Sequence, residues 1–214
     1  MISHSKQFVF VHVPKTGGLS VAAALRGVCE PLRLLEGENY WVDVHGTARH
    51  YIRRLGKPTW DRYFTFSFVR NPFDRLVSAF TYMAAGGNNP QDKALSERHL
   101  APFQGDFGAF VREFIAADGH KHLFHFYPQT DFLCNSKGKL QVDEVRKFED
   151  LQAGFDDICG RIGLPRHPLR HVNPTQSRVS RDYTSYYDEE MRAIVEDKYR
   201  RDLKQFGYHF GEGQ

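Results

Sequence analysis

The fold of this chain is decided by one stretch near its start, residues 8–20, with the sequence FVFVHVPKTGGLS. An apolar run typical of a β-strand ends at Pro14, passes through a Lys-Thr-Gly-Gly turn and leads into a helical pattern. Such a junction directs unpaired backbone N–H groups and the positive end of the helix dipole toward one point. The turn also supplies glycines for close backbone approach, one positive charge and two hydroxyl donors, in Gly17, Gly18, Lys15, Thr16 and Ser20. We therefore predict a phosphate-binding turn.

This turn differs from the standard P-loop in the position of its lysine. The pattern G-x-x-x-x-G-K-[ST] places the lysine after the glycines, whereas Lys15 precedes them here. An ordinary tight connection between a strand and a helix remains the alternative for this stretch taken alone.

A second junction of the same kind follows at residues 63–80. Residues 63–69 alternate aromatic or branched residues with small polar ones, which predicts a strand. The helix after it has a suitable N-cap, first residue and first-turn acid in Asn71, Pro72 and Asp74. Its apolar positions follow the spacing of one buried helical face: Phe73, Leu76, Val77 and Phe80.

Arg70 is the residue that gives this second junction a predicted function. It stands at the carboxyl end of the expected strand, the edge at which open α/β sheets bind ligands. The Ser78 hydroxyl, two turns into the helix, is expected to face the same crevice. The alternative is an ordinary solvated surface arginine.

The two junctions together resemble those of a known enzyme family. It is similar to the sulfotransferases that use 3′-phosphoadenosine 5′-phosphosulfate (PAPS), in the carbohydrate branch that includes the heparan and chondroitin O-sulfotransferases and small bacterial relatives. HVPKTGGLS at 12–20 resembles the family's 5′-phosphosulfate loop, and FVRNPFDRLVSAF at 68–80 its 3′-phosphate segment. Shorter similarities extend along the chain: QTDFL at 129–133, FEDL at 148–151, HVNPTQSR at 171–178 and YYD at 186–188.

The resemblance implies roles for individual residues. Backbone groups of residues 16–20 would hold the 5′-phosphate, and Lys15 would support departure of the leaving-group oxygen. Arg70 and Ser78 would hold the 3′-phosphate, and Arg178 would close over the adenosine end. Sulfuryl transfer is then an in-line displacement that depends on positioning and on neutralised charge. No metal is expected, because lysine, arginine and the helix end supply the positive charge.

One position departs from the family pattern. The family carries a hydroxyl residue after the paired glycines, and this chain has Leu19 there. The backbone N–H remains, but one side-chain donor to the 5′-phosphate is missing, which Thr16 and Ser20 are expected to replace.

The acceptor hydroxyl requires a base, and we predict that His45 is this base. This histidine is expected to end a short strand at 41–46, and its type titrates near neutrality. The resemblance adds that uronyl 2-O-sulfotransferases use a histidine in a similar His-Gly context. A structural role for His45 remains an alternative, as do nearby carboxylates as the base: Glu36, Glu38 and Asp43. We expect His12 to be a buried partner that orients the turn.

Composition limits the other possibilities. A net charge of +3 over 214 residues is too small to indicate a nucleic-acid partner, although arginines concentrate between positions 49 and 75 and would steer anions. No apolar run of 18 residues is present, so we expect neither signal peptide nor membrane anchor, and a cytoplasmic, bacterial protein. The densest histidine group, at 120–125, is expected to bind no metal, since His120 and His122 would point to opposite faces of a strand.

Strands that alternate with helices predict the fold class. We expect an α/β, P-loop-like three-layer fold with a central, mostly parallel sheet and helices on both faces, in a single sulfotransferase domain over 1–214. Further helices are expected at 19–29, 48–55, 107–115, 151–162 and 188–206, and a late strand at 142–148.

The predicted activity is transfer of the sulfuryl group from PAPS to a hydroxyl acceptor, a carbohydrate, whose identity the sequence leaves open. Two alternatives stand beside it. A nucleotide kinase-like P-loop enzyme would need a lysine after the glycines and an acidic Mg²⁺ ligand. A non-catalytic nucleotide- or glycan-binding protein would need neither.

Overall fold

The computed structural model describes residues 1–29, 45–170, 180 and 182–213. Its chain divides into two compact units. The first consists of Met1–Val69 and Gln129–Val172, and the second of Arg70–Pro128 and Asn173–Gln214. The prediction of a single domain stays a prediction.

The first unit is built on a sheet whose strands lie in the order β1-β2-β3-β4. These are β1 (Ile2–Ser3), β2 (Phe8–Val11), β3 (Phe64–Val69) and β4 (Glu144–Lys147). β1 pairs with β2 antiparallel, whereas β2 with β3 and β3 with β4 are parallel. In this register Val11, the last residue of β2, lies opposite Ser67, two residues before β3 ends. The predicted mostly parallel sheet is confirmed.

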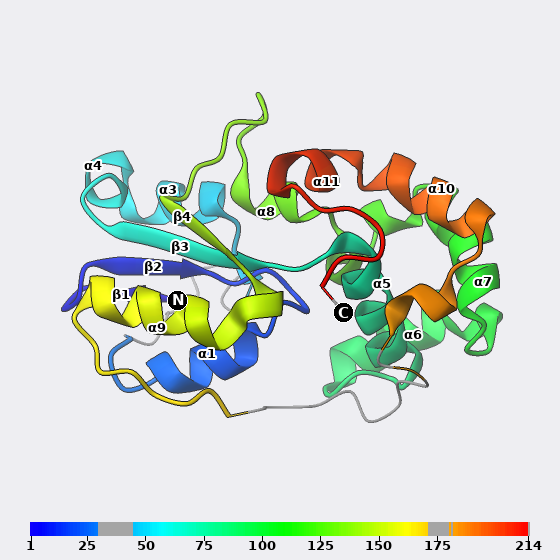
Figure 1. The fold of residues 1–214 in the computed structure, drawn as a ribbon, viewed down its shortest axis with the longest axis horizontal. Coiled ribbons are helices and arrows are strands. Elements are labelled where there is room, and N and C mark those ends of the chain that lie inside the picture. Colours follow the sequence, from blue (N-terminus) through cyan, green and yellow to red (C-terminus); the bar gives the residue numbers. More distant parts are fainter. Residues whose placement is uncertain (30–44, 171–179, 181, 214) are drawn as a thin grey trace. The chain divides into compact units, whose positions relative to one another are not determined.

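Helices cover both faces of this sheet (Figure 1). On one face the rings of β2 and β3 form a core with α1 (Gly18–Leu25) and α9 (Leu151–Ile162). The rings are Phe8, Phe10, Phe66 and Phe68, all 0% exposed. The opposite face carries α3 (Ala48–Leu55), α4 (Lys57–Trp60) and α8 (Gln129–Leu133). The predicted α/β, P-loop-like layering is therefore confirmed.

The second unit is helical. Its helices are α5 (Pro72–Ala84), α6 (Pro90–His99), α7 (Phe107–Ala109), α10 (Glu189–Lys198) and α11 (Arg200–Phe206). A π-helical segment, η2 (Phe110–Ile115), continues α7. Short 3₁₀ segments lie between them: η1 (Ala101–Phe103), η3 (Gly119–Lys121), η4 (Phe124–Phe126) and η6 (Tyr183–Tyr186). The core gathers around α5, whose Phe73 and Val77 are 0% exposed. The buried face predicted for this helix is confirmed.

Several local predictions differ from the structure. The helix expected at 188–206 is two helices that meet at Tyr199. His120 and His122 do not lie on a strand, because η3 and the residue after it contain them. The strand predicted at 41–46 falls mostly outside the described residues, and His45 itself has helical backbone. Within the described ranges, no helix is both long and apolar enough to cross a membrane.

Candidate functional site

The turn after β2 has the backbone geometry of an anion-binding loop. Lys15 has φ +67° and Gly17 has φ +74°, so two residues in a span of three adopt the left-handed region. A lysine rarely adopts this region, and such strain is concentrated at functional sites. Turns of this type direct successive N–H groups toward one concavity.

The amides that follow supply donors to this concavity. Ser20 N and Val21 N donate to the Gly17 carbonyl at 3.0 and 3.4 Å, which begins the hydrogen bonding of α1. Within the part of the chain that the structure describes, no acceptor receives the N–H groups of Gly17, Gly18 and Leu19. α1 has no side-chain cap and no acidic residue in its first turn. The first turn of α1 thus fits a phosphate group.

The side chains of the turn differ in their availability. The Thr16 hydroxyl is buried and donates to the Val13 carbonyl at 2.9 Å, which uses its one proton inside the turn. Ser20 is 8% exposed and Lys15 is half-buried. Leu19 is 45% exposed, although it is a large apolar residue. The position where the family carries a hydroxyl is therefore open to solvent or ligand.

Both glycines are required by close contacts. A Cβ on Gly17 would lie 2.6 Å from Leu151 Cδ2, in addition to its left-handed φ. A Cβ on Gly18 would lie 2.0 Å from Cδ2 of the His12 ring. The turn therefore packs against the start of α9 and against His12.

His12 connects this turn to His45. The His12 side chain is 2% exposed, which confirms that it is buried. Its ring stacks on Phe10 at 5.6 Å between centroids and lies 4.3 Å from the His45 ring. His45 Nδ1 lies 3.0 Å from the His12 carbonyl oxygen. The prediction that His45 ends a strand is wrong, but His45 does lie beside the residue that precedes the phosphate turn.

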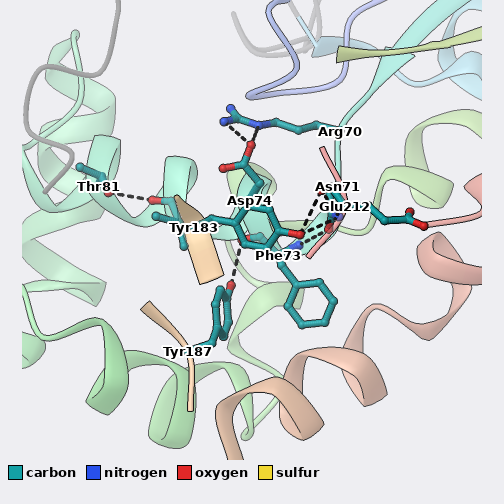
Figure 2. Close-up of polar contacts among 9 residues, drawn as sticks. Arg70, Asn71, Phe73, Asp74, Thr81, Tyr183, Tyr187 and Glu212 are labelled. Carbon is teal, nitrogen blue, oxygen red and sulfur yellow. Dashed lines mark hydrogen bonds and ion pairs between the residues drawn. The ribbon is translucent and has the colours of Figure 1, made fainter. Parts of the chain in front are cut away.

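The segment after β3 belongs to the second unit and contains Arg70. The Nε and Nη2 atoms of Arg70 each lie 2.6 Å from Asp74 Oδ2 (Figure 2). Both side chains are buried, at 8% and 6% exposed. Ser78 follows Asp74 by four residues on α5, hence on the same helical face, and is 4% exposed. Arg70 is thus an oriented, buried cation and not a solvated surface residue.

Asn71 fixes the start of α5, as its N-cap signal predicted. Its side-chain oxygen accepts from Phe73 N at 3.2 Å. Its amide group directs two protons toward three acceptors, so that one proton is shared: Tyr183 Oη at 3.1 Å, the His209 carbonyl at 2.9 Å and the Glu212 carbonyl at 3.1 Å (Figure 2). Sequence reasoning missed these three bonds, because their acceptors are more than 100 residues away.

From its sequence position, Arg75 is expected to be one of the surface arginines that steer anions. In the structure it is 1% exposed and donates to the His125 carbonyl at 3.2 Å. Burial lowers the pKa of Arg75, partly opposed by Tyr199 and Asp202. Arg75 is therefore part of the interior and does not add to a surface field.

Two further predictions concern Arg178 and the absence of a metal site. Arg178 lies outside the described residues. No group of three histidine, cysteine or carboxylate side chains suited to a metal ion occurs in the described parts of the chain.

Comparison with known proteins decides the family. The model of the Sulfotransferase family matches residues 1–209. The chain belongs to the sulfotransferase family. Among curated proteins it is similar to an uncharacterized protein of Archaeoglobus fulgidus, with 29% identity over 120 residues, which are 56% of this chain and 84% of that protein. No solved structure gives a significant match.

Membership in the sulfotransferase family supports sulfuryl transfer as the general reaction and a hydroxyl-bearing molecule as the acceptor. The mostly parallel sheet, with its strand–turn–helix junction at 8–25, agrees with this membership. The sulfotransferase family typically uses PAPS as the donor. The carbohydrate branch, the cytoplasmic location and the bacterial origin stay predictions.

Proposed function

We propose that this sulfotransferase moves the sulfuryl group of PAPS to a hydroxyl group of a carbohydrate. The observation that carries the proposal is the turn at 14–20, whose amides and lysine suit a phosphate, in a chain that belongs to the sulfotransferase family. PAPS supplies an activated sulfuryl group on a phosphate leaving group. The protein positions the reactants and neutralises charge.

The 5′-phosphosulfate end is assigned to the turn of the first unit. The amides of Gly17, Gly18 and Leu19 are the donors, and the left-handed Lys15 begins the concavity that they form. The Lys15 ammonium group neutralises charge that develops on the leaving phosphate oxygen. Removal of one such donor commonly lowers a rate about 10²–10³-fold.

The 3′-phosphate is assigned to Arg70 and Ser78. A guanidinium group presents a planar fork that matches a phosphate group, and Asp74 holds that fork in one orientation. Arg178 is assigned to the adenosine end on the resemblance alone.

His45 is assigned the role of base toward the acceptor hydroxyl. The support is the hydrogen bond from its Nδ1 to the carbonyl of His12, which precedes the phosphate turn, together with the general suitability of histidine as a base. The acceptor class, a carbohydrate, rests on the resemblance to the carbohydrate branch.

The identity of the donor can be tested by measuring how much different nucleotides stabilise the protein against thermal unfolding. We expect 3′-phosphoadenosine 5′-phosphate (PAP) to raise the melting temperature far more than ATP with Mg²⁺ at equal concentration. Lys15→Ala should reduce this shift, whereas Lys137→Ala, which changes an exposed lysine of the same unit, should not. A larger shift with ATP and Mg²⁺ would favour the kinase-like alternative and contradict the proposal.

A transfer assay tests the reaction itself. Radiolabelled PAPS is offered with sugars, glycolipids and phenols as acceptors. Label on a sugar hydroxyl supports the proposal. PAP binding without transfer to any acceptor would favour the binding-protein alternative.

A further inference from the structure

We infer that His12 is a positioning residue that holds His45 with its proton on Nδ1, so that Nε2 is the atom that takes the proton from the acceptor hydroxyl. This inference rests on the proposed function, which requires a base for a hydroxyl acceptor. It adds the reacting atom and the residue that selects it.

The tautomer follows from one hydrogen bond. His45 Nδ1 lies 3.0 Å from the backbone carbonyl oxygen of His12. A carbonyl oxygen only accepts, so Nδ1 must carry the hydrogen. In a neutral imidazole the other ring nitrogen then holds the lone pair, and this nitrogen is Nε2. His45 therefore acts as a base through Nε2.

The position of that carbonyl is set by the packing of the His12 ring. The ring stacks on Phe10 with an interplanar angle of 17°, and the His45 ring lies against it with an angle of 53°. His12 is 2% exposed, and the space above its ring is so small that a Cβ on Gly18 would lie 2.1 Å from Nε2 of His12. Gly18 also provides one of the amides of the phosphate turn. One buried ring thus contacts both the phosphate turn and the base.

This geometry supports direct transfer of the acceptor hydroxyl proton to His45 as the sulfuryl group moves. The acceptor O–H bond breaks, its proton bonds to the lone pair of His45 Nε2, and its electron pair forms the new O–S bond. The bond between sulfur and the 5′-phosphate oxygen breaks, and its electrons remain on that phosphate oxygen. The products are a sulfate ester and PAP, and the His45 imidazolium returns its proton to water.

Nitrogen NMR tests the tautomer without any reaction. Protein labelled with ¹⁵N in histidine is measured above the pH at which His45 becomes neutral, and the His45 signals are identified by their loss in His45→Gln. We expect the shift pattern of an imidazole protonated on Nδ1. A proton on Nε2 overturns the inference. Because no donor is present, this result does not depend on whether the proposed function is correct.

Variants of His12 test its positioning role. His12→Ala removes the ring, so we expect the Nδ1-protonated form to be lost and kcat to fall toward that of His45→Gln, with little change in the KM for the donor. His12→Phe keeps a ring that can stack and keeps the backbone carbonyl, so it should restore both. If His12→Ala leaves the tautomer, kcat and its pH profile unchanged, His12 does not position His45. If His12→Phe is inactive although Nδ1 of His45 stays protonated, the imidazole of His12 itself is required, which also overturns the inference.

Substitution of two different glycines distinguishes the positioning role of His12 from a general effect on protein stability. Gly18→Ala should displace the His12 ring and weaken PAP binding at least tenfold, whereas Gly27→Ala, which meets open space, should have no effect. In Gly18→Ala with His12→Ala the clash is removed, so PAP affinity should return while kcat stays low. If PAP affinity does not return, the loop and the ring are not coupled in this way and the inference fails.

Discussion

Arg70 and Asp74 form a buried ion pair in which the Nε and Nη2 atoms of the arginine both lie 2.6 Å from one carboxylate oxygen. Charge-assisted bonds of this length are among the strongest in proteins, and they fix the plane of the guanidinium group. An arginine so held is pre-organised, and a phosphate that binds it need not order it first.

The first prediction follows from this ion pair. Arg70→Lys keeps the positive charge but loses the planar fork, so recognition of the 3′-phosphate should weaken. We expect the preference for PAP over adenosine 5′-phosphate, measured by titration calorimetry, to fall about tenfold to a hundredfold. Arg192→Lys, which changes an arginine paired with Glu196 on α10, is the control and should leave the preference intact. An unchanged preference in Arg70→Lys would remove Arg70 from the 3′-phosphate site.

The second prediction concerns Leu19. Leu19→Thr adds a hydroxyl donor in the first turn of α1, at a side chain that is 45% exposed. One further hydrogen bond should raise the affinity for PAP roughly twofold to tenfold. Leu19→Ala is the matched control, because it removes apolar surface without adding a donor. Equal affinities of the two variants would show that the hydroxyl makes no contact with the phosphate.

The third prediction concerns the stability of the second unit. Asn71→Ala loses the N-cap of α5 and the three bonds of the side-chain amide, so the free energy of unfolding should fall by about 2–4 kcal/mol. Asn71→Ser keeps a capping oxygen and should recover about 1 kcal/mol of this loss. Urea unfolding measures both values. A wild-type stability for Asn71→Ser would mean that the bonds to Tyr183 and the C-terminal carbonyls contribute nothing.

The fourth prediction uses the pH dependence of Tyr199. Burial raises the pKa of this phenol above its ordinary value of 10.0, and its hydroxyl donates to the Phe126 carbonyl at 2.7 Å. A raised folded-state pKa means that the phenol's contribution to stability is complete below about pH 10 and is lost as the pH rises above it. Wild type should therefore exceed Tyr199→Phe in unfolding free energy by about 1 kcal/mol at pH 8, and the difference should shrink toward pH 11. A difference that is constant over this range would be inconsistent with the raised pKa.

The sequence predicted the elements whose signals lie within a few neighbouring residues. The strand at 64–69 and the helix that starts at Pro72 were found because alternation, the N-cap and the N1 proline are all encoded within a few residues. The division at Tyr199 was missed, since the helical period continues through it. The break coincides with the burial of Tyr199 and its bond to Phe126, a residue 73 positions earlier.

In the candidate site too, local patterns were recognised and contacts between distant residues were not. Gly17, Gly18 and Lys15 were recognised from their order in the turn, and the left-handed φ angles of Lys15 and Gly17 agree with that prediction. The contact between His12 and His45 joins residues 33 positions apart, so no local pattern indicates it. Arg75 was misjudged for the same reason: a lone arginine on a helix is usually solvated, and only tertiary packing shows that it is buried.

The central claim is that this chain transfers a sulfuryl group from PAPS with the help of Lys15. The most direct test is a single-turnover assay with ³⁵S-labelled PAPS and a panel of hydroxyl acceptors, for wild type and for Lys15→Ala. We expect label on a carbohydrate hydroxyl, with a rate about 10²–10³-fold lower in the variant. Transfer by Lys15→Ala at the wild-type rate, or no transfer by a wild type that binds PAP, would contradict this account.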